Sequence, residues 1–113
     1  MTSIEALWSV TFQLGEAGQG GGVLVFETGR LFGGDTSFAY TGHFTLSGDD
    51  LSAEVQAIRH TFVDDIIDLW ETGDDSFALT VAGRRVGDDL IEVRLTRNGT
   101  SIPATLKRIV ALP

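Results

Sequence analysis

The chain has no cysteine, so it contains neither a disulfide framework nor a thiolate metal site. Small secreted domains often depend on disulfides, and their absence favours a reducing compartment. Residues 1–5 lack the basic start and the apolar run of a secretory signal. No apolar stretch approaches the roughly 20 residues that a membrane-spanning helix needs. We therefore expect a cytoplasmic protein without a membrane partner.

Basic residues are scarce. The sequence has eight Lys and Arg residues and sixteen Asp and Glu residues, so the formal net charge is −8 at pH 7. Proteins that bind nucleic acids or anionic membranes need a basic surface for the phosphates. This charge therefore argues against a direct nucleic-acid partner, and it suits a basic protein partner instead.

Residues that could carry out catalysis are few. The two histidines, His43 and His60, are far apart, and neither forms a His-x-His or His-x3-His zinc pattern. Asp35 and His43 could form an acid–base pair, but Asp and His at this density are common on protein surfaces. The glycine run from Gly18 to Gly22 is not followed by the Lys-Ser/Thr of a phosphate loop. We expect no enzyme, no metal site and no cofactor.

Alternation of apolar and polar residues dominates the sequence. Between Trp8 and Leu14 every second residue is apolar, which is typical of a half-buried strand. Asn98-Gly99 is the strongest hairpin signal, and residues 15–22 read as a glycine-rich turn. Further strands are predicted at residues 23–27, 30–32, 37–46, 51–57, 77–82, 91–96 and 100–110. About eight strands with short turns predict one all-β domain over residues 1–113, an antiparallel up-and-down barrel. A two-sheet sandwich is the alternative.

One segment has helical spacing instead. Val63, Ile66, Ile67 and Trp70 lie at i, i+3, i+4 and i+7, which is the period of an amphipathic helix. Thr61 and Asp64 resemble a capping box at its start. A helix of about two turns is therefore expected from Thr61 to Trp70, covering an open end of the sheet.

Two strand features predict special geometry. Gly33-Gly34-Asp35 ends the strand that begins at Arg30, and it reads as a β-bulge or corner where glycine supplies unusual backbone angles. Residues 23–26 are apolar on both faces, and a strand of that kind is covered on both faces. Because homo-oligomers are usually two-fold symmetric, we expect a homodimer through the outer face of residues 23–26.

Four sequence segments together resemble the GrlR family of negative regulators of type III secretion. They are Leu7-Trp8-Ser9-Val10-Thr11-Phe12, Gly21-Gly22-Val23-Leu24-Val25, Gly33-Gly34-Asp35 and Tyr40-Thr41-Gly42. The similarity covers roughly Leu7 to Arg59. It implies a lipocalin-like barrel of eight strands that can dimerise. It also implies a non-enzymatic protein that binds and restrains a transcriptional activator.

The family's regulatory type has a run of acidic residues in the turn after the Tyr-x-Gly strand. The matching turn here is Ser47-Gly48-Asp49-Asp50, with two acidic residues and one residue fewer. Asp49 and Asp50 are accordingly the candidate partner-binding residues. Further aspartate pairs at residues 64–65, 74–75 and 88–89 would extend an acidic docking surface.

A second hypothesis is a small apolar ligand inside the barrel, because eight strands leave room for side chains or one small ligand. Side-chain bulk decides between these hypotheses. The large residues expected inside are Trp8, Phe12, Phe26, Phe32, Phe38, Phe44, Trp70 and Phe77. Small residues that could leave space are Gly42, Ala53 and Ala57.

Overall fold

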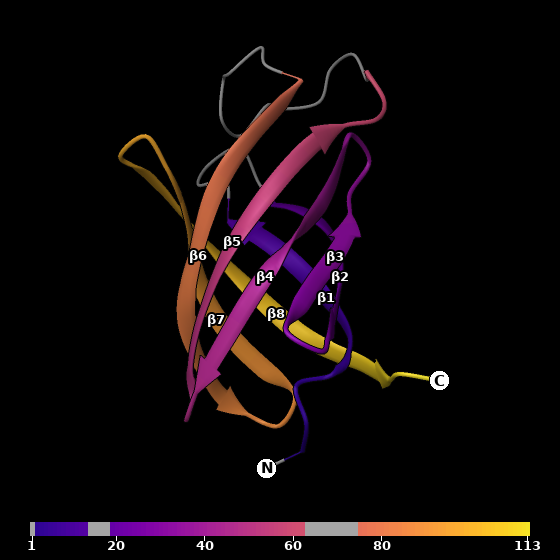
Figure 1. Ribbon diagram of the computed structural model, residues 1–113, viewed down its shortest axis with the longest axis vertical. Coiled ribbons are helices and arrows are strands. Elements are labelled where there is room, and N and C mark those ends of the chain that lie inside the picture. Colours follow the sequence, from indigo (N-terminus) through magenta and orange to yellow (C-terminus); the bar gives the residue numbers. More distant parts are fainter. Residues whose placement is uncertain (1, 14–18, 63–74) are drawn as a thin grey trace.

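A computed structural model describes residues 2–13, 19–62 and 75–113, and its eight strands form a closed barrel (Figure 1). The strands are β1 (Ala6–Gln13), β2 (Gln19–Glu27), β3 (Arg30–Gly34), β4 (Phe38–Ser47), β5 (Asp50–Arg59), β6 (Ser76–Gly87), β7 (Leu90–Arg97) and β8 (Thr100–Ala111). Each pairs antiparallel with its sequence neighbours, and β1 pairs with β8 to close the barrel. The predicted eight-stranded up-and-down barrel is confirmed.

The described residues contain no helix. Of the helix predicted from Thr61 to Trp70, only Thr61 and Phe62 belong to them, and these two are neither helical nor in a strand. Residues 63–70 lie outside the described ranges, so the structure does not bear out this helix. Within those ranges no helix is long and apolar enough to cross a membrane.

Hydrophobic alternation decides which face of each strand turns inward. In β5, the side chains of Leu51, Ala53, Val55 and Ala57 are buried, and the residues between them are exposed. The same two-residue period places the inward apolar residues of β6, β7 and β8, such as Leu79, Ile91 and Leu106, in one core. In a closed barrel one face of every strand meets the interior, so alternation alone orients these four strands.

Two short turns have the backbone geometry of tight hairpins. Thr28 and Gly29 have φ values of 50° and 75°, and Asn98 and Gly99 have values of 48° and 82°. Two successive positive φ values are typical of the type I′ turn, whose twist matches that of the flanking strands. The hairpin predicted at Asn98-Gly99 is confirmed, and Thr28-Gly29 forms a second one between β2 and β3.

β2 begins at Gln19, earlier than predicted. Gly20, Gly21 and Gly22 belong to β2 and pair with Phe12, Thr11 and Val10 of β1. Glycine disfavours strands in isolation, but pairing with β1 overrides that weak preference. A Cβ atom on Gly21 would lie 2.9 Å from the carbonyl oxygen of Val10, so the two backbones approach more closely than a side chain allows.

Of the bulge or corner predicted at Gly33-Gly34-Asp35, the bulge is wrong, whereas β3 does end at Gly34 and Asp35 lies in the loop that leads to β4. The pairing of β3 with β2 and with β4 runs through Gly33 and Gly34 without a register shift, and neither glycine has a positive φ. Crowding is the reason for glycine instead. A Cβ atom on Gly33 would lie 2.0 Å from the carbonyl oxygen of Val23, and one on Gly34 would lie 2.8 Å from that of Phe38.

Aromatic side chains fill much of the interior beside β1, β2 and β4. The rings of Trp8 and Phe26 meet edge to face with centroids 6.3 Å apart, and those of Phe26 and Phe44 do so at 5.0 Å. Phe12, Phe38 and Phe77 also belong to the core, as predicted. Phe32 does not, because it is 40% exposed and pairs with Val25 on the outer face. Trp70 lies outside the described residues.

Trp8 near the start of β1 and Arg85 near the end of β6 are both buried. The indole nitrogen of Trp8 donates a hydrogen bond to the carbonyl oxygen of Ile4 at 2.9 Å. The Arg85 guanidinium lies 5.8 Å from the Trp8 ring and donates to the carbonyl oxygen of Asp88 at 2.9 Å. Arg85 is only 3% exposed, and these contacts compensate for the water that its charge has lost.

Candidate functional site

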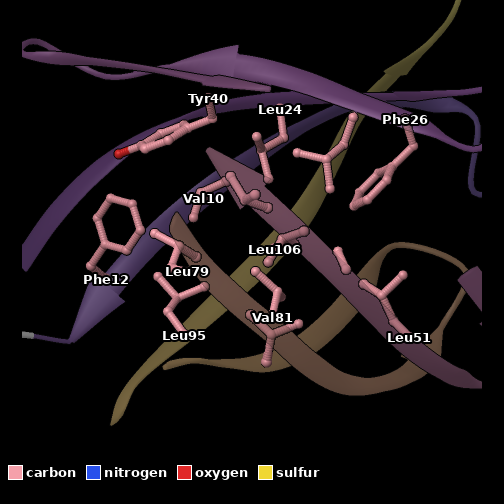
Figure 2. Close-up of a pocket in the computed structure, with 14 residues that line it drawn as sticks. Val10, Phe12, Leu24, Phe26, Tyr40, Leu51, Leu79, Val81, Leu95 and Leu106 are labelled. Atoms are coloured by element: carbon pink, nitrogen blue, oxygen red, sulfur yellow. The ribbon is translucent and has the colours of Figure 1, made fainter. Parts of the chain in front are cut away.

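A cavity lies inside the barrel, and Figure 2 shows the side chains around it. The volume open to the centre of a water molecule is about 50 Å³, whereas one water needs roughly 10–15 Å³. All eight strands contribute lining residues: Val10, Phe12, Leu24, Phe26, Leu31, Tyr40, Leu51, Ala53, Val55, Leu79, Val81, Val93, Leu95 and Leu106. Tyr40 is the one residue of this set whose side chain carries a polar atom. The composition of this lining favours apolar contents over charged ones.

More than half of the described lining residues of the cavity come from β5 to β8. Aliphatic residues of β5 to β8 form much of its lining, including Ala53, Val81 and Val93. Ala53 was predicted to leave space, and it lines the cavity. Ala57 is buried in the core but is not among the described lining residues.

Gly42 does not leave space either. A Cβ atom there would lie 2.0 Å from the carbonyl oxygen of Glu54, so this glycine lets β4 approach β5. It pairs with Leu31 on one side and with Val55 on the other, and both of these residues line the cavity. Glycine at position 42 thus permits the close approach of β4 to β5, which contributes lining residues to the cavity.

Asp35 organises the loop between β3 and β4. Its Oδ1 accepts hydrogen bonds from the backbone N–H groups of Ser37 at 2.9 Å and Phe38 at 2.7 Å. Its own N–H donates to the carbonyl oxygen of Phe38 at 2.8 Å. This pattern is the local turn that an aspartate side chain stabilises. The carboxylate is held in one orientation as a result.

The second carboxylate oxygen of Asp35 accepts a hydrogen bond from the hydroxyl of Tyr40. Burial is the main cause that raises the pKa of Tyr40 above its ordinary value of 10.0, and the hydrogen bond with Asp35 and the charge of Asp35 raise it further. The phenol is therefore neutral at physiological pH. Tyr40 joins the loop at one end of the barrel to the lining of the cavity.

The five residues of the predicted motif, Gly33, Gly34, Asp35, Tyr40 and Gly42, all lie on the hairpin of β3 and β4. The structure joins Asp35 to Tyr40 and gives the glycines a role in backbone packing. Sequence reasoning did not identify the Asp35–Tyr40 contact. The available signal was that Asp35 and Tyr40 are only five positions apart, because a short loop between two strands can bring two such residues into contact.

The acid–base pair considered for Asp35 and His43 does not form. His43 is exposed on the outer face of β4, opposite Arg30 and Glu54. It lies four positions along β4 from Ala39, the partner of Gly34, which is about 13 Å along a strand. The imidazole of His60 contacts the Asp35 backbone instead, with Nε2 3.0 Å from the carbonyl oxygen.

Metal ligands do not gather in the parts of the chain that the structure describes. Within residues 2–13, 19–62 and 75–113, no three His, Cys, Asp or Glu side chains form a group that could hold a metal ion. The described cavity lining offers hydrocarbon contacts and one phenol.

Two of the predicted aspartate pairs lie at the same end of the barrel. Asp49 and Asp50 are at the turn from β4 to β5, and Asp88 and Asp89 form the turn from β6 to β7. The up-and-down topology places both turns beside the N-terminus (Figure 1). Asp74 and the pair at residues 64–65 lie outside the described residues. The aspartates of these two turns are far apart in the sequence but lie at the same end of the barrel.

Part of that charge is already offset. Arg84 lies between the predicted partner-binding residues, with Nη2 4.0 Å from Asp49 Oδ2 and Nη1 3.8 Å from Asp50 Oδ1. At the neighbouring turn, the hydrogen bond from the Thr2 backbone N–H is the main cause that lowers the pKa of Asp88. These side chains are solvent-exposed, so their charges are screened by salt.

The outer wall has an apolar row across four strands. In register, Val110 of β8 pairs with Leu7 of β1, Leu7 with Val25 of β2, and Val25 with Phe32 of β3. Val23 lies beside this row and is 43% exposed. The two-sided apolar character predicted for residues 23–26 is therefore part of a larger surface.

The comparisons with known proteins do not assign the chain to a family. No protein-family model matches the chain, and no curated protein is significantly similar to it in sequence. The resemblance to the GrlR family, and the lipocalin-like description that came with it, stay expectations drawn from the residues.

Proposed function

We propose that this protein is a non-enzymatic binding protein that takes a small, mainly apolar molecule into the barrel. The observation that carries the proposal is the interior cavity, in which hydrocarbon side chains make up all but one of the described lining residues. Each methylene group that leaves water for such a cavity contributes about 0.8 kcal/mol. Affinity should therefore rise with chain length until the cavity is full.

A titration with linear alcohols from butan-1-ol to octan-1-ol tests the proposal. The sequence has two tryptophans, so Trp70→Phe leaves Trp8 as the only indole fluorophore. Trp8 lies edge to face with Phe26, which lines the cavity. Ligand entry is expected to change its fluorescence in a saturable way, with tighter binding for each added methylene at first.

A matched pair of substitutions locates the binding. Ala53→Phe places a ring in the cavity, whereas Ala78→Phe places the same ring on the outer face of neighbouring β6. We expect hexan-1-ol affinity to fall at least tenfold in the first variant and to be unchanged in the second. Circular dichroism checks the fold, and the smaller change Ala53→Leu replaces Ala53→Phe if the ring prevents folding. Equal affinity in the cavity variant and the wild type would refute interior binding.

A second candidate function is the restraint of a basic protein, such as a transcriptional activator, in the manner of the GrlR family. The observation that favours it is the gathering of Asp49, Asp50, Asp88 and Asp89 at one end of the barrel. Acidic groups at a rim mainly accelerate association with a basic partner. The two functions use different parts of the molecule, so they can be tested separately.

A further inference from the structure

Tyr40 is the one residue of the described cavity lining whose side chain carries a polar atom, and the hydrogen-bonding capacity of its hydroxyl is partly used. A phenol has one proton to donate and two lone pairs that accept. The proton of Tyr40 is donated to Asp35, so acceptance is the capacity left for another molecule. In Figure 2 the hydroxyl oxygen of Tyr40 lies toward Phe12 and away from Phe26 and Leu51.

From this polarity we propose that the cavity prefers apolar molecules whose polar group donates a hydrogen bond, with alcohols as the chemical class, and that the Tyr40 oxygen accepts that bond. The inference rests on the proposed binding function and adds to it the polarity of the ligand. Molecules of the same size that can only accept a hydrogen bond, such as ethers and carboxylates, are disfavoured.

Asp35 is the reason that Tyr40 cannot simply turn its proton toward a ligand. An ionised carboxylate accepts hydrogen bonds and has none to donate. Both of its oxygens are engaged, one with two backbone N–H groups and one with Tyr40. If Tyr40 donated to a ligand instead, a partly buried carboxylate oxygen would lose its donor, and such losses are costly.

Charge disfavours carboxylate ligands further. Asp35 is bonded directly to the Tyr40 hydroxyl, so a second carboxylate at that position would meet a like charge. An ionised group also loses its hydration when it enters an apolar cavity. A neutral alcohol avoids both costs, and its hydroxyl proton meets an acceptor made more electron-rich by Asp35.

Hexan-1-ol and 1-methoxypentane test the inference, because they are isomers that differ in whether their oxygen carries a proton. The Trp8 fluorescence titration of the Trp70→Phe protein gives the ratio of the two affinities. One net hydrogen bond corresponds to a factor of about 2 to 10 in affinity. We expect Tyr40→Phe to reduce the preference for the alcohol by that factor, while the ether binds about as well as before.

Asp35→Asn provides a second variant with the opposite expected result. Its side-chain oxygen can still accept from the backbone of the loop, and its NH₂ group can donate to the Tyr40 oxygen. The Tyr40 proton is then free for the ligand. The preference should shift toward 1-methoxypentane, and binding of hexanoate should improve relative to hexan-1-ol.

The outcomes separate this inference from the proposed function. If neither isomer binds the parent protein saturably, the proposed function fails and this inference fails with it. If both bind and their affinity ratio is the same in the parent, Tyr40→Phe and Asp35→Asn proteins, the cavity binds ligands but Tyr40 does not select them. If one of the two variants loses the circular dichroism of a β-sheet, the other is used alone. Each variant by itself is expected to change the ratio of the hexan-1-ol and 1-methoxypentane affinities.

Discussion

Most residues of β5 to β7 alternate between inward and exposed positions, whereas β2 and its neighbours carry apolar residues on both faces. On β5, for example, Val55 faces the core, while Glu54 and Gln56 face water. On β2, Phe26 is buried, and Val23 and Val25 lie on the outer wall with Leu7 and Phe32. A closed barrel covers only the inner face of a strand. The difference indicates that one side of the wall is suited to a further contact, whereas the other is suited to water.

Glycines at close backbone approaches occur on both sides. A Cβ atom on Gly33 of β3 or on Gly83 of β6 would collide with a neighbouring strand. Gly87 of β6 has open space around it and no positive φ. Glycine is therefore needed where two strands approach closely, and the predictions below follow in order of decreasing effect.

The largest effect is expected from Gly33→Ala, because its methyl group would lie 2.0 Å from the Val23 carbonyl oxygen. Overpacking of this kind costs about 1–3 kcal/mol of the free energy of unfolding. Gly34→Val should also destabilise the protein by roughly 1–3 kcal/mol, through crowding against Phe38. Urea denaturation measures both changes.

Gly87→Ala is the matched control on the other side of the barrel. It should alter the free energy of unfolding by less than about 0.5 kcal/mol, as surface substitutions usually do. Equal stability of Gly33→Ala and Gly87→Ala would mean that β2 and β3 can separate without cost, and crowding would not be the reason for glycine at position 33.

An intermediate effect is expected from Tyr40→Phe. Loss of its hydrogen bond to Asp35 should cost about 1 kcal/mol at neutral pH. The pKa of Tyr40 is raised in the folded state, so the unfolded chain ionises first and stability should decline as the pH rises above 10.0, the ordinary value. Below that pH the contribution is fully present.

Tyr40 is the only tyrosine in the sequence, so the ultraviolet absorbance of tyrosinate reports this group alone. The folded protein should ionise at a higher pH than the urea-unfolded protein, and Tyr40→Phe should flatten the alkaline loss of stability. Identical titration curves for the folded and unfolded chains would contradict the burial of Tyr40 and its contact with Asp35.

A homodimer through the outer face of β1 to β3 remains a prediction, and it now includes Phe32. We expect Phe32→Ser to shift the mass measured by light scattering at micromolar concentration from dimer toward monomer, with little change in fold stability. Ile58→Ser is the control, since Ile58 is 43% exposed but lies on β5. A monomeric parent protein would contradict the predicted dimer.

The smallest effect on the fold is expected from Asp49→Asn with Asp50→Asn, because exposed ion pairs such as those with Arg84 contribute about 0–1 kcal/mol. The net charge changes from −8 to −6 by the removal of two charges. A basic partner isolated from the native host should associate more slowly with the variant at low salt, and the difference should shrink at high salt.

Glu54→Gln with Glu92→Gln removes the same charge from the wall of the barrel and serves as the control. Both glutamates are exposed and point outward from β5 and β7. If the two double variants slow association equally, total charge rather than the acidic turn would determine capture.

Local patterns predicted much of the barrel. The alternation in β5 to β8 and the hairpin at Asn98-Gly99 depend on neighbouring residues only, and both were predicted correctly. Gly20 to Gly22 were assigned to a turn, because the pairing with β1 that extends β2 involves residues distant in sequence. Phe32 was placed inside for a related reason: β3 is short, and both of its faces carry apolar residues, so alternation could not orient it.

The candidate site was predicted only in part. Ala53 was named as a small inward residue, and Asp35 and Tyr40 were named as a motif without a contact between them. The acidic pairs were visible in the sequence, whereas the end that Asp49 shares with Asp88 follows from the even number of strands between their turns. The cavity itself depends on how side chains of all eight strands fill a common interior.

The sequence by itself determined the all-β class, the number of strands and the absence of cysteine chemistry, because these follow from composition and from a two-residue period. The tertiary structure decided the rest. Closure of the sheet brought β1 beside β8, set the inner face of β3 and left a cavity among residues far apart in the chain. Volumes and hydrogen-bond polarities are properties of packed groups, and a linear order of residues does not contain the distances that define them.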